Sequence, residues 1–397
     1  MKKILYIGWC MPYDSVAHAG GQIFNYYIKE MSKEASIKLL TIALPGELEK
    51  ATIEKYGVDT TYIDFSNLNL LDKVKSINSK YNPWHKYGHI VTKYKAEAFI
   101  SELNEMKKDG YNPDLIVLQW TQVILMINEI KRIYPESKYV AVEEDVTFLR
   151  LRREYEAEDG IKYLYRKIIY KNEKKREMQA LSKCDIVYTN NKKDQRLLIS
   201  NGFEKKNLKV LVPYYYKYNV IRKNLRDNKD ILFFGNMGRP ENYNAAIEFI
   251  ENVLPKLKTV GARFVVLGGN AEKLKKYEKK NVTITGYIKN PDEYFANSAI
   301  FVAPIKQGAG IKIKVLEAMS SGIPVITTEV GIEGIPATNE KDYLLYKNED
   351  ELVKCIDYLL NNKEMCRKIG ESGKVFVREN FNFEDSIQKY KKCLLSL

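Results

Sequence analysis

The sequence has little of what membrane-spanning, secreted or metal-binding proteins need. No apolar run approaches the ~20 residues that cross a bilayer, and Met-Lys-Lys leads into a short apolar run at residues 4–9 rather than a signal peptide. The five cysteines are scattered and never spaced as CxxC, and the three histidines lack ligand spacing. We therefore expect a soluble cytoplasmic protein without a disulfide framework, a metal or another cofactor.

What is present is the composition of a globular protein. Hydrophobic residues make up 45% and charged residues 29% of the chain, and 397 residues suggest two domains at ~100–200 residues each. Lys+Arg exceeds Asp+Glu by 64 − 51 = 13, which permits an anionic partner. The excess is spread evenly and accompanies no recognised nucleic-acid-binding motif, so we expect no nucleic acid as partner.

Short β-branched runs alternate with amphipathic helical stretches, a pattern typical of α/β proteins with doubly wound parallel sheets. The first set of expected strands is residues 4–7, 37–42, 115–118, 139–142, 185–188 and 209–212. The second set is residues 231–234, 263–267, 282–285, 299–303 and 324–327. The polar stretch 214–230 separates the two sets and indicates a connection between two domains.

The most informative segment is a strand end followed by a glycine loop and a helix. Gly308 and Gly310 allow a tight turn and close approach of a ligand. The helix start, aided by Lys312 and Lys314, forms an anion site. Glu317 follows about one and a half turns later, where a carboxylate can accept hydrogen bonds from two vicinal hydroxyls. Phosphates beside a diol describe a nucleoside diphosphate, whereas the alternative is a solvated helix face after an ordinary loop.

This segment, continued through residues 325–334, closely resembles the nucleotide-sugar site of family-four-like glycosyltransferases, the glycosyl transferases group 1. The resemblance extends in order to residues 231–237, to residues 282–287 and to the N-terminal Ala19-Gly20-Gly21. It implies the GT-B fold, with two Rossmann-like domains that face a cleft. We therefore expect an acceptor-side domain at residues 1–213, a nucleotide-sugar domain at 214–378, and a helix at 379–397 that packs back on the first domain.

The resemblance also implies roles for single residues. Glu317 would hold the ribose hydroxyls, Gly20 and Gly21 would lie beside the diphosphate and donor sugar, and Gly286 and Tyr287 would contact the nucleobase. The other expected donor-binding residues are Gly235, Asn236, Arg239, Gly308, Gly310, Lys312 and Lys314.

Two departures from the family pattern affect the donor site. Ala309 replaces a glutamate that contacts the donor sugar in many relatives, so sugar recognition does not carry over. Residues 238–242 replace an Arg and a Lys-Gly pair that contact the diphosphate, which leaves Arg239 as the candidate there. Lys312 and Lys314 can compensate as a cationic clamp on the leaving diphosphate.

An acidic cluster, Glu143-Glu144-Asp145, follows an expected buried strand, where the sites of α/β proteins form. Many relatives have a histidine near Glu144. Together with Lys312, Glu144 and Asp145 are therefore catalytic candidates that could orient the acceptor hydroxyl or accept its proton. A solvated or helix-capping cluster is the alternative. Glu143 and Asp145 match a metal-binding pair poorly, and GT-B enzymes usually need no metal, so we predict no metal site.

Three further features have structural alternatives. The basic, aromatic-rich stretch at residues 162–176 could lie on an anionic membrane surface, or could be a solvated helix face. His18 fits an ordinary loop histidine, although it precedes the glycine pair. Trp120 could line the acceptor side, but a core aromatic is the simpler interpretation.

These observations predict a retaining glycosyltransferase that moves a sugar from a nucleotide-diphosphate sugar to a glycan or lipid-linked acceptor. The resemblance suggests bacterial surface polysaccharide or glycoconjugate synthesis, in the cytoplasm or peripherally on the inner face of the plasma membrane. A nucleotide-sugar epimerase on the same fold and a non-enzymatic anion-binding or nucleic-acid-binding protein are the alternatives. A dinucleotide oxidoreductase is disfavoured because no GxGxxG follows the first strand.

Overall fold

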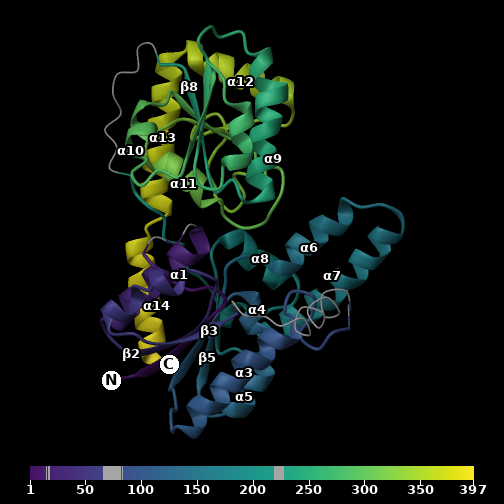
Figure 1. Ribbon diagram of the computed structural model, residues 1–397, viewed down its shortest axis with the longest axis vertical. Helices are drawn as coiled ribbons and strands as arrows, with labels where there is room; N and C mark the ends of the chain where they lie inside the picture. The colour runs from purple at the N-terminus through teal and green to yellow at the C-terminus, as the bar shows by residue number, and fades with distance from the viewer. Residues whose placement is uncertain (15, 17, 66–81, 83, 219–227) are drawn as a thin grey trace. The chain divides into compact units, whose positions relative to one another are not determined.

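The chain forms two compact α/β units (Figure 1). The computed structural model describes residues 1–397 except 15, 17, 66–81, 83 and 219–227. The first unit comprises Met1–Pro213 and Glu384–Leu397, and the second comprises Tyr214–Phe383. Each unit contains one parallel sheet, which confirms the predicted fold class. Most of the predicted connection, residues 219–227, lies outside the described residues.

The sheet of the first unit has seven strands in the order β3-β2-β1-β4-β5-β6-β7, and neighbouring strands are parallel. Their bounds are β1 Lys3–Gly8, β2 Ser36–Ala43, β3 Asp59–Asp64, β4 Leu115–Gln119, β5 Lys138–Glu143, β6 Ile186–Thr189 and β7 Leu208–Val210. The strand order reverses between β1 and β4, so the carboxyl ends of these strands are the expected place for a site.

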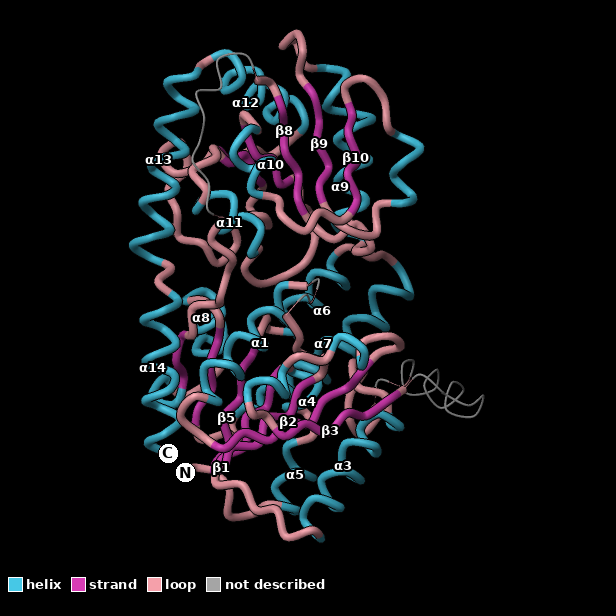
Figure 2. Tube along the Cα trace, turned by 60° about the vertical axis from the view of Figure 1, so that its left-hand side comes forward, coloured by secondary structure: helices cyan, strands magenta, loops and turns pink. Residues whose placement is uncertain are grey.

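The helices of the first unit cover both faces of its sheet (Figure 2). They are α1 Ala19–Ser32, α3 Lys93–Lys108, α4 Thr121–Ile124, α5 Ile127–Ile133, α6 Thr147–Glu156, α7 Gly160–Leu181, α8 Lys192–Ser200 and α14 Phe383–Ser396. Phe99 and Leu103 of α3 are fully buried in one core cluster with Leu118 of β4. These apolar contacts hold α3 against the sheet.

The last helix, α14, packs on the first unit. The Tyr390 hydroxyl lies 3.2 Å from that of Tyr6 in β1, and Lys391 pairs with Glu30 of α1 at 2.9 Å. We expected a last helix at residues 379–397, and α14 is a separate helix from Phe383 to Ser396, after α13, which spans Lys363–Asn380. The break between the two helices falls at residues 381–382, just before the boundary of the two compact units between Phe383 and Glu384.

The second unit has six parallel strands in the order β10-β9-β8-β11-β12-β13. The strands are β8 Asp230–Phe234, β9 Arg263–Leu267, β10 Val282–Gly286, β11 Ile300–Ala303, β12 Val325–Thr327 and β13 Leu344–Leu345. The helices are α9 Pro240–Glu248, α10 Asp292–Asn297, α11 Ile313–Ser320, α12 Glu349–Asn361 and α13 Lys363–Asn380. Because every strand runs in the same direction, the loops after β8, β10 and β11 meet at one edge of the sheet.

Candidate functional site

The loop between β11 and α11 contains the glycines that the sequence singled out. Gly308 and Gly310 have φ angles of 105° and 72°, in the region that glycine adopts readily. Lys312 Nζ donates to the carbonyl oxygens of Ala309 and Gly310 at 3.0 and 2.8 Å, so this ammonium braces the loop from within. No side chain caps the start of α11, so its first N–H groups remain suited to an anion.

Glu317 lies in the second turn of α11 and is only 5% exposed. Burial raises the pKa of its carboxyl to about 8, although the backbone N–H of Tyr216 and the charge of Lys314 both oppose this. A buried carboxyl of this kind gains stability as a carboxylate when further donors reach it. The diol of a ribose would supply two such donors.

Lys314 is half-buried beside the end of β8 rather than fully exposed on the helix. Its Nζ donates to Asn242 Oδ1 and lies 5.0 Å from the centre of the Phe233 ring. A Cβ at position 235 would approach Nζ to 2.7 Å, so Gly235 leaves room for the ammonium. Burial, followed by the charge of Arg239, lowers the pKa of Lys314 to about 7.

The turn after β8 holds two more predicted residues. Asn236 Oδ1 accepts from the backbone N–H of Gly238 at 2.8 Å and from Asn270 Nδ2 at 2.9 Å. Arg239 precedes α9, pairs with Glu241 at 2.7 Å and is 61% exposed. Its guanidinium is thus bound at one edge and open to solvent at the other.

Gly286 ends β10 at the same edge of the sheet, and Tyr287 directly follows it with a side chain that is 68% exposed. The structure therefore brings the loops that carry the second-unit candidates to one edge. Gly20 and Gly21 belong to the first unit, in the first turn of α1. His18 caps that helix, because its Nδ1 accepts from the backbone N–H of Gly21 at 3.0 Å.

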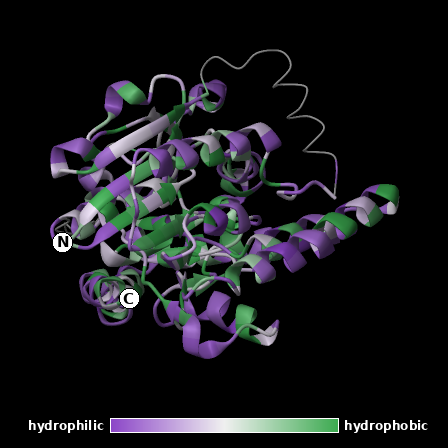
Figure 3. Cartoon of the chain, turned by 90° about the horizontal axis from the view of Figure 1, so that it is seen from below, coloured by the Kyte–Doolittle hydropathy of each residue, from purple (hydrophilic) through white to green (hydrophobic). Residues whose placement is uncertain are grey.

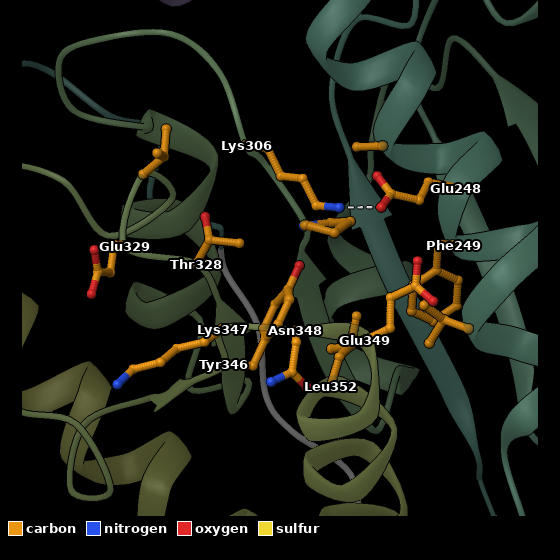
Figure 4. A pocket seen from close by; sticks show the side chains of 14 residues that line it. Glu248, Phe249, Lys306, Thr328, Glu329, Tyr346, Lys347, Asn348, Glu349 and Leu352 are labelled. Atoms are coloured by element: carbon orange, nitrogen blue, oxygen red, sulfur yellow. Dashed lines mark hydrogen bonds and ion pairs between the residues drawn. The ribbon is translucent and has the colours of Figure 1, made fainter. Parts of the chain in front are cut away.

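A pocket of about 410 Å³ lies in the second unit between α9 and α12 (Figure 4). Figure 4 shows the ion pair of Lys306 with Glu248 on one side and the Tyr346 ring in the middle. The described residues that line the pocket include none of the predicted donor-binding residues. Thr328, Glu329 and Val330, which line it together with Lys306, lie in or beside the segment whose sequence resembles the nucleotide-sugar site.

In the first unit, Glu144 is clamped by two amides at the carboxyl ends of β4, β5 and β6. Its carboxylate accepts from Gln119 Nε2 and, at 2.7 Å, from Asn190 Nδ2. Burial raises the pKa of Glu144 to about 7 against these hydrogen bonds, and the charge of Asp145 raises it further. The amide oxygens of Gln119 and Asn190 are buried and have no partner among the described residues. This arrangement suits recognition of hydroxyl groups.

Glu143 points elsewhere, although it is adjacent in sequence. It is 1% exposed and accepts a hydrogen bond from the Thr121 hydroxyl. Within the described parts of the chain, no group of three or more His, Cys, Asp or Glu side chains could hold a metal ion.

Trp120 follows β4 with a φ of 74°, which is unusual for a residue with a side chain. Its ring meets that of Phe24 edge-on at 5.1 Å, and a Cβ at Gly20 would lie 3.5 Å from it. Trp120 is partly buried. The ring thus lies beside the glycine pair, close in sequence to the Gln119 clamp.

Sequence reasoning did not single out Gln119 and Asn190 as partners of Glu144, nor Asn242 as the partner of Lys314. For Gln119 and Asn190, their positions after expected strands could have identified them as site residues. Gln119 ends β4 and Asn190 directly follows β6, so both stand at carboxyl ends of neighbouring strands. Asn242 lies inside α9, and only the fold reveals its contact with α11.

Residues 228–362 match the family described as Glycosyl transferases group 1. An uncharacterized 44.6 kDa protein in the cps region of Klebsiella pneumoniae is 23% identical, over 96% of this chain and 97% of its own length. An uncharacterized glycosyltransferase of Methanocaldococcus jannaschii is 22% identical, over 65% of this chain and 68% of its own length.

Two solved structures match the fold over 100% of both chains. Anabaena HepE in complex with UDP and glucose has a TM-score of 0.69 at 12% identity. Sucrose-phosphate synthase from Thermosynechococcus elongatus has a TM-score of 0.71 at 15% identity. The resemblance seen in the sequence is confirmed: the chain is a glycosyltransferase of the GT-B fold, with a group 1 domain at residues 228–362.

Proposed function

We propose that the protein transfers a sugar from a nucleotide-diphosphate sugar to a glycan or lipid-linked acceptor, with retention of the anomeric configuration. The observation that carries this proposal is Glu317, a buried carboxyl one turn inside a helix whose start is uncapped and preceded by a glycine loop. Phosphates at the helix start and a ribose diol at the carboxylate satisfy both groups at once.

The donor end of the reaction needs a stabilised leaving group. When the bond between the sugar C1 and the diphosphate oxygen breaks, negative charge grows on the diphosphate and positive charge on the sugar ring. We assign Lys314, Arg239 and the first N–H groups of α11 to the diphosphate, and Lys312 to holding the loop in shape. Gly286 and Tyr287 would contact the base, with Tyr287 offering an exposed ring.

The acceptor end is assigned to the first unit. Glu144 has a pKa of about 7, so it can hold or take up a proton near neutral pH. We propose that its carboxylate orients a hydroxyl of the acceptor or donor, with Asp145 as a second carboxylate beside it. Gly20 and Gly21 remain candidates for close approach of the donor.

Three observations support the biological setting of this proposal. One relative is described by its place in a cps region, which fits bacterial surface polysaccharide or glycoconjugate synthesis. HepE has been solved with UDP and with UDP-glucose, which favours a uridine donor among those to test. In the described parts of the chain no helix is long and apolar enough to cross a bilayer. We propose action at the cytoplasmic face of the plasma membrane.

A panel of nucleotide sugars tests the proposal. The protein should release nucleoside diphosphate from one donor, slowly with water and faster with an acceptor glycan. Proton NMR of the first sugar released should show the donor's anomer before mutarotation. Release of the opposite anomer would contradict retention. Conversion of the donor into another nucleotide sugar would instead establish the epimerase alternative.

A further inference from the structure

The α6–α7 hairpin presents an apolar stripe to solvent. In Figures 1 and 3 these two helices reach away from the rest of the first unit, with apolar colouring near the outer end. Ile161, Leu164 and Ile168 of α7 are 86%, 60% and 41% exposed. Their spacing of three and four residues puts them on one face of the helix.

The opposite face of α7 packs against α6. The Tyr155 ring lies 5.5 Å from Tyr163 and 5.1 Å from Tyr170. Arg166 pairs with Glu154 at 3.3 Å and with Glu158 at 3.1 Å. These contacts fix the rotation of α7, so the apolar stripe cannot turn inward without breaking them.

The basic stretch is therefore not one uniform face. Arg166 is engaged by α6, and Lys167 donates to the Tyr163 hydroxyl at 2.9 Å. Lys162, Lys171 and Lys175 are exposed and form no ion pair with other described residues. Lys171 and Lys175 continue the stripe at the same three-and-four spacing.

We propose that this face of α7 binds the surface of an anionic lipid bilayer. Ile161, Leu164 and Ile168 would enter the boundary between headgroups and acyl chains, while the three lysines contact lipid phosphates. A bilayer fits better than a folded protein, because apolar residues at the outer end followed by cations match the order of acyl chains and anionic headgroups. The inference deepens the proposed function by naming the surface that brings the enzyme to a lipid-linked acceptor.

Co-sedimentation of the full chain with vesicles tests the inference. Vesicles of phosphatidylcholine with about a third phosphatidylglycerol are compared with pure phosphatidylcholine. The double variant Ile161→Ser/Leu164→Ser should lower the partition coefficient on anionic vesicles about tenfold or more. Val260→Ser is the matched control, since Val260 is 93% exposed and lies in the second unit. It should bind like the wild type.

Salt separates the two parts of the interaction. Lys171→Gln/Lys175→Gln should weaken binding to anionic vesicles at low salt. At 1 M salt the Debye length is ~3 Å and charge attraction is screened, so this variant and the wild type should bind the anionic vesicles equally and weakly. Both should still bind the vesicles more strongly than Ile161→Ser/Leu164→Ser. The inference is overturned if the serine variant binds as well as the wild type, or if the wild type stays in the supernatant. It is also overturned if the stripe proves to join two copies, seen as vesicle-free dimers that the serine variant abolishes.

Nucleoside diphosphate affinity, measured on the same variants, keeps this inference apart from the proposed function. Unchanged affinity with lost vesicle binding supports both proposals. If the wild type bound vesicles but no nucleoside diphosphate, the inferred membrane-binding face of α7 would be supported and the proposed donor site would be wrong.

Discussion

Two side chains of the second unit, the buried Glu317 and the half-buried Lys314, change charge close to neutral pH in opposite senses. Burial raises the pKa of Glu317 to about 8 and lowers that of Lys314 to about 7, because it disfavours the charged form of each. A ribose diol needs the carboxylate, which forms as pH rises through about 8. A diphosphate needs the ammonium, which is lost as pH rises through about 7.

We therefore predict a bell-shaped pH dependence of nucleoside diphosphate affinity, with its maximum between pH 7 and 8. Titration calorimetry between pH 6.5 and 9 measures it, above the phosphate's own pKa near 6. Glu317→Gln should remove the loss on the acid side, and Lys314→Gln the loss on the alkaline side. A profile that is flat in the wild type would show that neither group faces the ligand.

Glu144 permits a second prediction for a single residue. Glu144→Gln keeps the size of the side chain but removes its charge and its capacity to accept a proton. We expect kcat to fall ~100-fold or more, with nucleoside diphosphate affinity unchanged because the residue belongs to the first unit. Asp145→Asn is the comparison, and its effect should be smaller since Asp145 lacks the amide clamp. Equal kcat for Glu144→Gln and the wild type would rule out this role.

Sequence reasoning located single residues unevenly. Glu317 stood out because loop, helix and carboxylate lie within ten residues of one another. Lys314 was assigned to the same anion site, but its burial against Phe233 depends on packing between distant segments. The clamp around Glu144 joins three strands from residues 119, 144 and 190, and no local pattern contains that contact.

At the scale of elements, two buried carboxyls join β5 to the α6–α7 hairpin. Glu177 of α7 accepts the backbone N–H groups of Thr147 and Phe148 at the start of α6, both at 2.9 Å. The charge of nearby Glu143 opposes a second negative charge on Glu177, so we expect the two buried carboxyls to keep one proton between them. Burial raises the pKa of Glu143 to about 8 and that of Glu177 in the same direction.

The unfolded chain releases this proton above its ordinary pKa of ~4.3, whereas the folded chain keeps it. The stabilisation is thus complete below pH ~4.3 and is lost as pH rises through about 8, with a slope of at most ~1.4 kcal/mol per pH unit for one proton. We predict that the free energy of unfolding of Glu143→Gln falls less steeply between pH 6 and 8.5 than that of the wild type, because the introduced amide can donate to Glu177 at any pH.

Urea unfolding followed by tryptophan fluorescence measures the effect, because all three tryptophans, at positions 9, 84 and 120, lie in the first unit. Glu333→Gln, a change at an equally well-buried residue of the second unit, should leave the slope as in the wild type. An unchanged slope in Glu143→Gln would show that the carboxyl pair does not share a proton.

The elements that sequence patterning missed have physical reasons. β3 lies at a sheet edge, and its Asp59, Thr60 and Thr61 leave no continuous apolar run. β13 has two residues, too few to show any period. Buried central strands such as β1 and β5 were predicted to within a residue or two, because burial on both faces demands continuous apolar side chains.

At the scale of the whole molecule, the alternation of strands and helices was enough to predict two parallel sheets. The N-terminal segment of the first unit ends at Pro213, beside the change of composition at residue 214. The return of α14 to the first unit was expected from the family resemblance, since a polar helix at the end of a chain does not by itself indicate where it packs.

A further prediction for the whole enzyme concerns metal. Lys314, Arg239 and the start of α11 provide positive charge for a diphosphate without a cation. We therefore predict that EDTA leaves turnover of the donor unchanged and that Mg²⁺ or Mn²⁺ alters it less than twofold. Loss of turnover with EDTA and its recovery with either ion would require a metal site.

The central claim is that a nucleoside diphosphate binds on α11 through Glu317, and calorimetric titration with UDP and GDP at pH 8 tests it most directly. Three proteins are compared: wild type, Glu317→Gln, and Asp342→Asn as a control of similar burial in the same unit. We predict that one nucleotide binds the wild type and Asp342→Asn alike, and binds Glu317→Gln more weakly by ~1.5–3 kcal/mol, the loss expected for hydrogen bonds to a charged group. Equal affinity of Glu317→Gln and the wild type would contradict the account.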